Sequence, residues 1–148
     1  CYEEVPGLLT AAMPEGIVVQ QCYPVSRKLK ELCYVNYIMA FDYHEGRPQE
    51  AEPAMSELLS RESLVVRKKS NKAKAGSTEV DLIPRIRKWH MECQSDAMMV
   101  DLVVAAQNPG RNPELIRSAF CAEYPEYTPD FVSFHRREVL DGEGKPFR

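Results

Sequence analysis

Residues 97–106, with the sequence AMMVDLVVAA, place an apolar side chain at every second position. Successive side chains of a β-strand point to opposite faces of the sheet, so this periodicity gives the segment one wholly apolar face. That face consists of Met98, Val100, Leu102, Val104 and Ala106. The intervening positions are also mostly apolar, which is typical of a strand in the middle of a sheet. We therefore predict a central strand here, for which the rest of the chain must supply neighbours and a covering layer.

Residues 34–43, YVNYIMAFDY, alternate in the same way and predict a second strand. Asn36 and Asp42 lie on its polar face, opposite the apolar face that contains Met39 and Phe41. Shorter runs that are rich in β-branched, aromatic or alternating apolar residues predict further strands. These runs are residues 16–23, 62–69, 87–93 and 131–137.

Three segments have the start signals and the apolar spacing of amphipathic helices. Residues 4–13 and 52–60 each carry a proline near the start, and a third helix begins at Asn112 and Pro113. Residues 80–86, VDLIPRI, are predicted to be irregular, because the proline at position 84 bars a long central strand.

The order of these elements predicts the fold class. From residue 34 onward it is strand, helix, strand, strand, strand, helix, strand. Two interleaved split units of this kind predict an α+β, ferredoxin-like split βαβ sandwich, with a mostly antiparallel sheet, two or three helices on one face and one extra strand. We expect a single domain over residues 4–138 and a flexible tail over residues 139–148. The helix and strand at 4–23 resemble the end of a preceding unit.

Length, charge and cysteine content narrow the class of protein. A chain of 148 residues suggests one domain, and its net charge of −3 argues against nucleic-acid binding driven by overall charge. A local basic patch can still attract phosphate within a Debye length of ~8–10 Å. The five cysteines are odd in number and form no CxxC pair, which favours reduced thiols in a cytoplasmic protein over disulfides or a zinc ribbon. No apolar run approaches the ~20 residues of a membrane span, so we expect no membrane partner.

The search for catalytic motifs finds no glycine-rich phosphate loop, no HExxH and no GxSxG. The three histidines lack metal-ligand spacing, and the cysteines contain no CxxxCxxC triplet, the motif that holds the iron–sulfur cluster of a radical-SAM enzyme. Glu79 and Asp81 are the carboxylates that we would test as acid–base groups. Because no nucleophile accompanies them, a local salt-bridging set is the favoured interpretation. We therefore predict no catalytic residue and no bound metal.

Residues 67–74 gather five cations, and further positive charge follows at 85 and 87. The residues that we predict to contact a polyanion are Arg67, Lys68, Lys69, Lys72, Lys74, Arg85 and Arg87. A cationic connection between two strands can bind phosphates. It can also be a solvated hairpin tip that discourages edge pairing. No aromatic residue lies among the cations of residues 67–76, although sites for single-stranded nucleic acid usually stack the bases on one. Both interpretations therefore stay open.

The segment LVVRKKSNKAKAGSTEVDLIPRIRKW, residues 64–89, resembles the signature of the bacterial radical-SAM-linked domain of unknown function. In that family a strand ends in a basic run, a short lysine and glycine loop follows, and then an E-V-D segment with a proline. Two further stretches are similar to the family in the expected order. They are LLTAAMPEGIVVQQCYPV at 8–25 and NPELIRSAF at 112–120. The resemblance extends over about residues 8–138, and it implies that the chain is the C-terminal portion of a longer family domain.

The resemblance implies a role beside a radical-SAM protein with a cobalamin-binding region. The iron–sulfur cluster, S-adenosylmethionine and cobalamin are then expected on that partner, with no cofactor in this chain. We expect an accessory domain without catalytic activity of its own, which binds or presents a macromolecular substrate through the basic strand and loop. RNA is the expected substrate. The alternative is a non-catalytic docking domain for the radical-SAM partner.

Overall fold

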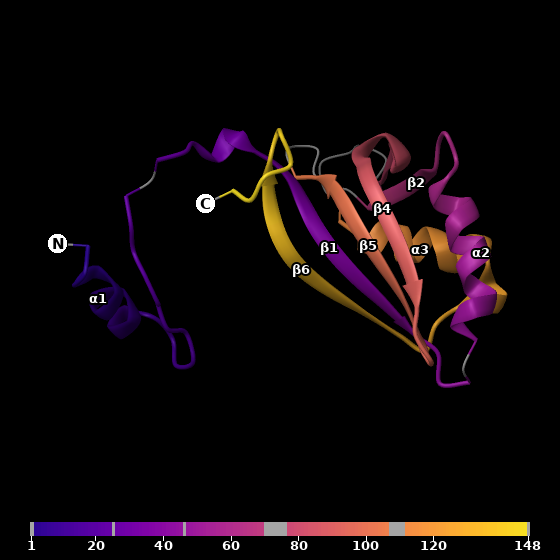
Figure 1. Cartoon of the computed structure of the whole chain (residues 1–148), viewed down its shortest axis with the longest axis horizontal. Coiled ribbons are helices and arrows are strands. Elements are labelled where there is room, and N and C mark those ends of the chain that lie inside the picture. Colours follow the sequence, from indigo (N-terminus) through magenta and orange to yellow (C-terminus); the bar gives the residue numbers. More distant parts are fainter. Residues whose placement is uncertain (1, 25, 46, 70–76, 107–111, 148) are drawn as a thin grey trace.

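The computed structural model describes residues 2–24, 26–45, 47–69, 77–106 and 112–147. Its body is a four-stranded sheet with the order β4-β5-β1-β6, in which all neighbours are antiparallel. The two long helices lie on one face of this sheet (Figure 1). The strands are β1 (Leu32–Asp42), β4 (Ile86–Cys93), β5 (Ala97–Ala105) and β6 (Phe131–Asp141).

The connections confirm the predicted α+β, ferredoxin-like arrangement. Helix α2 (Pro48–Leu59) follows β1, and helix α3 (Glu114–Glu123) joins β5 to β6. Helix α3 therefore connects two strands that have β1 between them, and the connection that begins with α2 leads from β1 to β4, with β5 between them. This is the split βαβ pattern, and it places residues 97–106 in the centre as predicted.

The predicted extra strand is part of a separate hairpin. Strands β2 (Val65–Lys69) and β3 (Ser77–Asp81) pair with each other and form a separate two-stranded sheet. The prediction that residues 80–86 are irregular is wrong for Val80 and Asp81, because pairing with β2 carries the strand to Asp81. It is also wrong for Ile86, which begins β4 and pairs with Val104. The turn of 3-10 helix that contains Pro84, Ile83–Arg85, follows β3.

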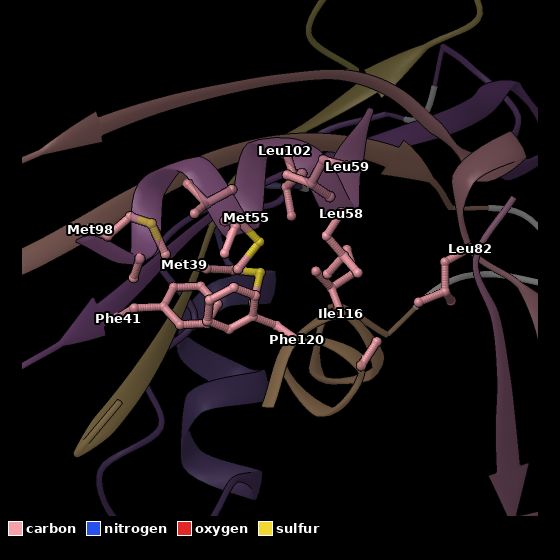
Figure 2. Close-up of a cluster of buried hydrophobic side chains, with 14 of the residues drawn as sticks. Met39, Phe41, Met55, Leu58, Leu59, Leu82, Met98, Leu102, Ile116 and Phe120 are labelled. Carbon is pink, nitrogen blue, oxygen red and sulfur yellow. The ribbon is translucent and has the colours of Figure 1, made fainter. Parts of the chain in front are cut away.

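The core lies between the sheet and the helices (Figure 2). The apolar faces of β1 and β5 meet helix positions spaced three or four residues apart. The ring of Phe120 meets that of Phe41 edge-on, with 5.8 Å between centroids. The fully buried large side chains include Met39, Phe41, Met55, Leu58, Leu82, Met98, Val100, Leu102, Val104 and Phe120. The β5 face is confirmed except for Ala106, which is half-buried.

The hairpin closes one end of this core from the helix side. Leu64 and Leu82 are buried at its base, and the Leu82 N–H donates to the Leu64 carbonyl at 2.9 Å. Val66 and Val80, opposite each other in the two strands, pack against the core. The face of the hairpin that carries Val65 therefore points away from the core.

The N-terminal arm, residues 2–24, extends away from the body (Figure 1). Its helix α1 (Val5–Ala12) agrees with the predicted 4–13 but buries no residue. The predicted strand at 16–23 is wrong, since those residues form no strand. A strand needs a neighbour for its backbone hydrogen bonds, and no strand in the described part of the chain lies beside this segment. The Val19 N–H donates instead to the Thr10 hydroxyl at 2.9 Å.

A cluster around Asp141 holds the segment that follows the arm against the body. The guanidinium of Arg27 donates to Asp141 Oδ2 at 2.9 Å and lies 4.9 Å from the centre of the Phe147 ring. The Lys145 backbone N–H and the Arg27 guanidinium hold the pKa of the Asp141 carboxyl below its usual value. Residues 142–147 fold back, so that the Phe147 N–H donates to the Val139 carbonyl. The domain limits of 4–138 and 139–148 stay a prediction.

Candidate nucleic-acid interface

The predicted cations of the hairpin are partly offset by acidic neighbours. The Nε atom of Arg67 lies 3.7 Å from Oε1 of Glu79, and both side chains are well exposed. The backbones of Lys68 and Lys69 lie opposite Thr78 and Ser77. Lys72 and Lys74 lie outside the described residues. The described part of the hairpin therefore contributes an exposed but paired arginine.

Arg85 and Arg87 lie beyond the hairpin, and Arg87 belongs to a different surface. Arg85 is exposed in the turn that follows β3. Arg87, on β4, reaches over the ring of Tyr34 at 4.6 Å and donates from Nη1 to the Gly142 carbonyl at 3.2 Å. Tyr34 alternates with the core residue Val35, so these interactions are on the sheet face opposite the helices.

That opposite face, which we call the open face, carries the side chains that alternate with the core. No described helix or strand covers it (Figure 1). The register places polar residues of three strands side by side near its middle. Asn36 comes from β1, Asp101 from β5, and Lys88 and His90 from β4.

Two β-bulges each add one arginine to the open face. In β4, Ile86 and Lys88 pair with consecutive residues of β5, which leaves Arg87 as the extra residue. In β6, Arg136 and Glu138 pair with consecutive residues of β1, which leaves Arg137 as the extra residue. Bulges re-aim side chains and are frequent beside functional sites. Arg137 is held by Asp101, with Nη1 3.6 Å from Oδ2.

A hollow of about 330 Å³ lies between the strands that carry these residues. Its lining is Asn36, Lys88, Trp89, His90, Asp101 and Val103. The Asn36 amide donates from Nδ2 to Asp101 Oδ1 at 2.7 Å and fixes the carboxylate at one side of the hollow. The Asn36 Oδ1 atom is buried and has no donor among the described residues. A buried acceptor without a donor costs about 1–3 kcal/mol, and such a deficit marks the sites where a ligand or water completes the structure.

The charges on the open face are not all neutralised within the fold. Asp101 contacts Asn36 and Arg137. Neither Arg87 nor Lys88 pairs with a carboxylate within the part of the chain that the structure describes, and both are exposed. These cations flank the hollow and the Tyr34 ring, so the site combines phosphate-binding charge with a ring and hydrogen-bonding groups.

The carboxylates singled out for catalysis have structural surroundings. Asp81 accepts from the Ser63 hydroxyl at 2.7 Å and from the Leu64 N–H at 2.8 Å, at the base of the hairpin. Within the described ranges no group of three His, Cys, Asp or Glu side chains could hold a metal ion. Burial raises the pKa of the Cys93 thiol to about 11, so it is protonated at neutral pH.

Comparison with known proteins identifies the family. The family described as "Uncharacterized protein conserved in bacteria (DUF2344)" matches residues 2–113. The chain belongs to this family. The DUF2344 match includes the arm, β1, the hairpin, β4 and β5, and ends just before α3. No curated protein and no solved structure matches the chain. None of the helices in the described portion of this DUF2344 member is long and apolar enough to cross a membrane.

Sequence reasoning missed most of the open face, although signals for part of it were present. Asp101 is the one charged residue in the apolar run 97–106, and Asn36 interrupts the apolar and aromatic residues that β1 carries before Asp42. Such interruptions are typical of groups that face a partner or a site. Arg137 carries no such signal, because its orientation follows from a bulge that only the paired strands define.

Proposed function

We propose that this domain is an accessory RNA-binding module for a radical-SAM enzyme with a cobalamin-binding region. The open face and the basic segment, residues 67–74, together engage the RNA, and the partner supplies the reaction and its cofactors. The radical-SAM link rests on the resemblance of residues 64–89 to radical-SAM-linked domains. The RNA-binding role rests on the surface of the sheet.

The observation that carries the RNA-binding role is the pair of bulges that add Arg87 and Arg137 to the open face. A four-stranded antiparallel sheet with helices behind it is a known platform for single-stranded RNA, whose bases stack on exposed rings and arginine planes. This is an analogy of fold. The stack of Arg87 on Tyr34 and the cation of Lys88 support the analogy chemically, because guanidinium and ammonium groups bind phosphate.

The overall charge of −3 sets the conditions under which such binding is measurable. Local cations act on phosphates only within about a Debye length, which is roughly 10 Å at 0.1 M salt. Binding should therefore be tight at low salt and weaken steeply as salt rises.

Replacing Arg87, Lys88 and Arg137 together with alanine is expected to weaken binding to a short single-stranded RNA. For single strands, the slope of log K against log salt should fall in magnitude by about 0.7 for each phosphate that the variant no longer neutralises. Fluorescence polarisation over a salt series measures this slope. A second variant with alanine at Lys68, Lys69, Lys72 and Lys74 tests the basic segment separately.

Arg47→Ala is the matched control, because Arg47 is an exposed arginine just before α2, away from the open face. It should leave the slope unchanged. The proposal is wrong if the wild-type chain does not bind at low salt, or if the control and the triple variant lower the slope equally.

A second candidate function, docking to the radical-SAM protein, is favoured by the N-terminal arm. Leu8 is 71% exposed, Val18 is 69% exposed and Tyr23 is 61% exposed. Apolar side chains that are exposed to this degree are available to be buried against a protein partner. The arm also contains three glutamates and no lysine or arginine, so it suits an apolar, cationic protein surface and not RNA.

Changing Leu8 and Val18 together to aspartate should weaken binding to the radical-SAM protein by at least about tenfold, because each buried aliphatic side chain contributes roughly 1.5–3 kcal/mol. Bio-layer interferometry with the purified partner measures the affinity. Val65→Asp, at an exposed apolar position of the hairpin, is the control. Unchanged binding of the arm variant, or equal loss in the control, would exclude the arm as the docking segment.

A further inference from the structure

We infer that the hollow on the open face holds one base of the bound RNA and selects a base that presents an amino group, with cytosine preferred to uracil. This rests on the proposed RNA-binding function and adds a specificity to it. The residue that distinguishes the bases is Asp101.

Asp101 is held rigidly enough to read a hydrogen-bonding pattern. It lies in the central strand between Val100 and Leu102, which are fully buried, so its backbone is fixed. The Asn36 amide occupies Oδ1. Oδ2 lies 3.6 Å from Nη1 of Arg137, which is beyond hydrogen-bonding distance, and the Asp101 side chain is 34% exposed. Oδ2 can therefore accept a hydrogen bond from a ligand.

The remaining lining supplies donors and an apolar surface. Lys88 and His90 come from the neighbouring strand, and His90 lies directly opposite Asp101 in the register. The Lys88 ammonium can only donate. Val103 provides the apolar surface against which the flat part of a ring can lie. A volume of about 330 Å³ is at the lower end of ligand sites, which span about 300–1,000 Å³.

This arrangement of one acceptor beside donors matches cytosine. The amino group of cytosine donates to a carboxylate, whereas uracil has a carbonyl oxygen at the same position. Uracil would therefore place its acceptor against the acceptor of Asp101. The ring nitrogen and carbonyl of cytosine remain free to accept from Lys88 or His90.

The test compares oligocytidylate and oligouridylate of twelve nucleotides, which have equal length and charge. The wild-type chain should bind the cytidine strand at least about tenfold more tightly, given the usual discrimination by a good base contact. Asp101→Asn keeps an acceptor for Asn36 and offers an amide donor to uracil. It should abolish or reverse the preference.

Glu92→Gln is the matched control, because it removes one negative charge from the open face, as Asp101→Asn does. Glu92 is an exposed residue of β4 that lies outside the hollow. It should keep the preference for cytosine. Asn36 is a positioning residue, so Asn36→Ala should lower the ratio of the two affinities and leave the salt slope unchanged.

Each outcome decides the inference. Equal binding of the two strands by the wild-type chain overturns it while leaving the RNA-binding function in place. An unchanged preference in Asp101→Asn overturns it as well. If neither strand binds at low salt, the proposed function and this inference fail together.

Discussion

Replacing Phe120 with alanine is expected to lower the free energy of unfolding by about 3–5 kcal/mol. The ring of Phe120, on α3, is fully buried against the sheet, where it meets Phe41 edge-on (Figure 2). Its centroid also lies 5.6 Å from that of the Tyr124 ring. Truncation removes the ring from the core and leaves a cavity that the rigid sheet cannot close. Since whole domains are stable by only about 5–15 kcal/mol, urea denaturation should show a much lower midpoint.

Phe131→Ala is the control for this measurement. Phe131 lies at the start of the edge strand β6 and is 61% exposed, so its loss should change stability by no more than about 0.5 kcal/mol. A change below about 1 kcal/mol for Phe120→Ala would contradict the packing of α3 on the sheet. An equal loss for the two variants would contradict the assignment of the open face.

The two central strands could be predicted from sequence because their information is local. Alternation in residues 97–106 identifies the buried face of β5, and Met98 to Val104 lie where it predicts. The same holds for Met39 and Phe41 in β1. The element order then determines the split βαβ arrangement, because right-handed crossovers leave few alternatives.

Features that depend on pairing between distant strands could not be predicted. Residues 16–23 have the β-branched composition of a strand, but composition does not supply a neighbour to accept their hydrogen bonds. Residues 77–81 form a strand because β2 lies beside them.

The candidate site also combines residues that the sequence indicates with features that depend on strand pairing. Asp101 and Asn36 are visible in the sequence as polar interruptions, but they are 65 residues apart, and only the β1–β5 register brings their side chains together. The bulges at Arg87 and Arg137 arise from register shifts that no local pattern marks. Among the predicted contact residues whose side chains the structure describes, Arg87 is the one that lies on the open face.

The second large effect is expected at Asp81, where substitution by alanine should lower the free energy of unfolding by about 2–4 kcal/mol. The carboxylate accepts hydrogen bonds from the Ser63 hydroxyl, the Leu64 N–H and the Ile83 N–H, the last at 3.3 Å. Alanine leaves the part-buried N–H groups of Leu64 and Ile83 without an acceptor, and each such loss costs about 1–3 kcal/mol, whereas the exposed Ser63 hydroxyl can turn to water. Asp81→Asn, which keeps an acceptor oxygen, should lose less. Chemical denaturation of the two variants measures the difference.

Glu79→Ala distinguishes this structural role from acid–base catalysis. Glu79 lies two residues before Asp81 in the sequence, and its carboxylate is 3.7 Å from Nε of Arg67. Because this ion pair is highly exposed, it contributes at most about 1 kcal/mol to the free energy of unfolding. If the two carboxylates acted together on a substrate, both alanine variants should lose activity while keeping their stability. If Asp81 instead holds the base of the hairpin, its variant alone should unfold early, and RNA binding through the basic segment should weaken with it. A stable Asp81→Ala chain would contradict the structural role, and Glu79 and Asp81 would again be candidates for an active site.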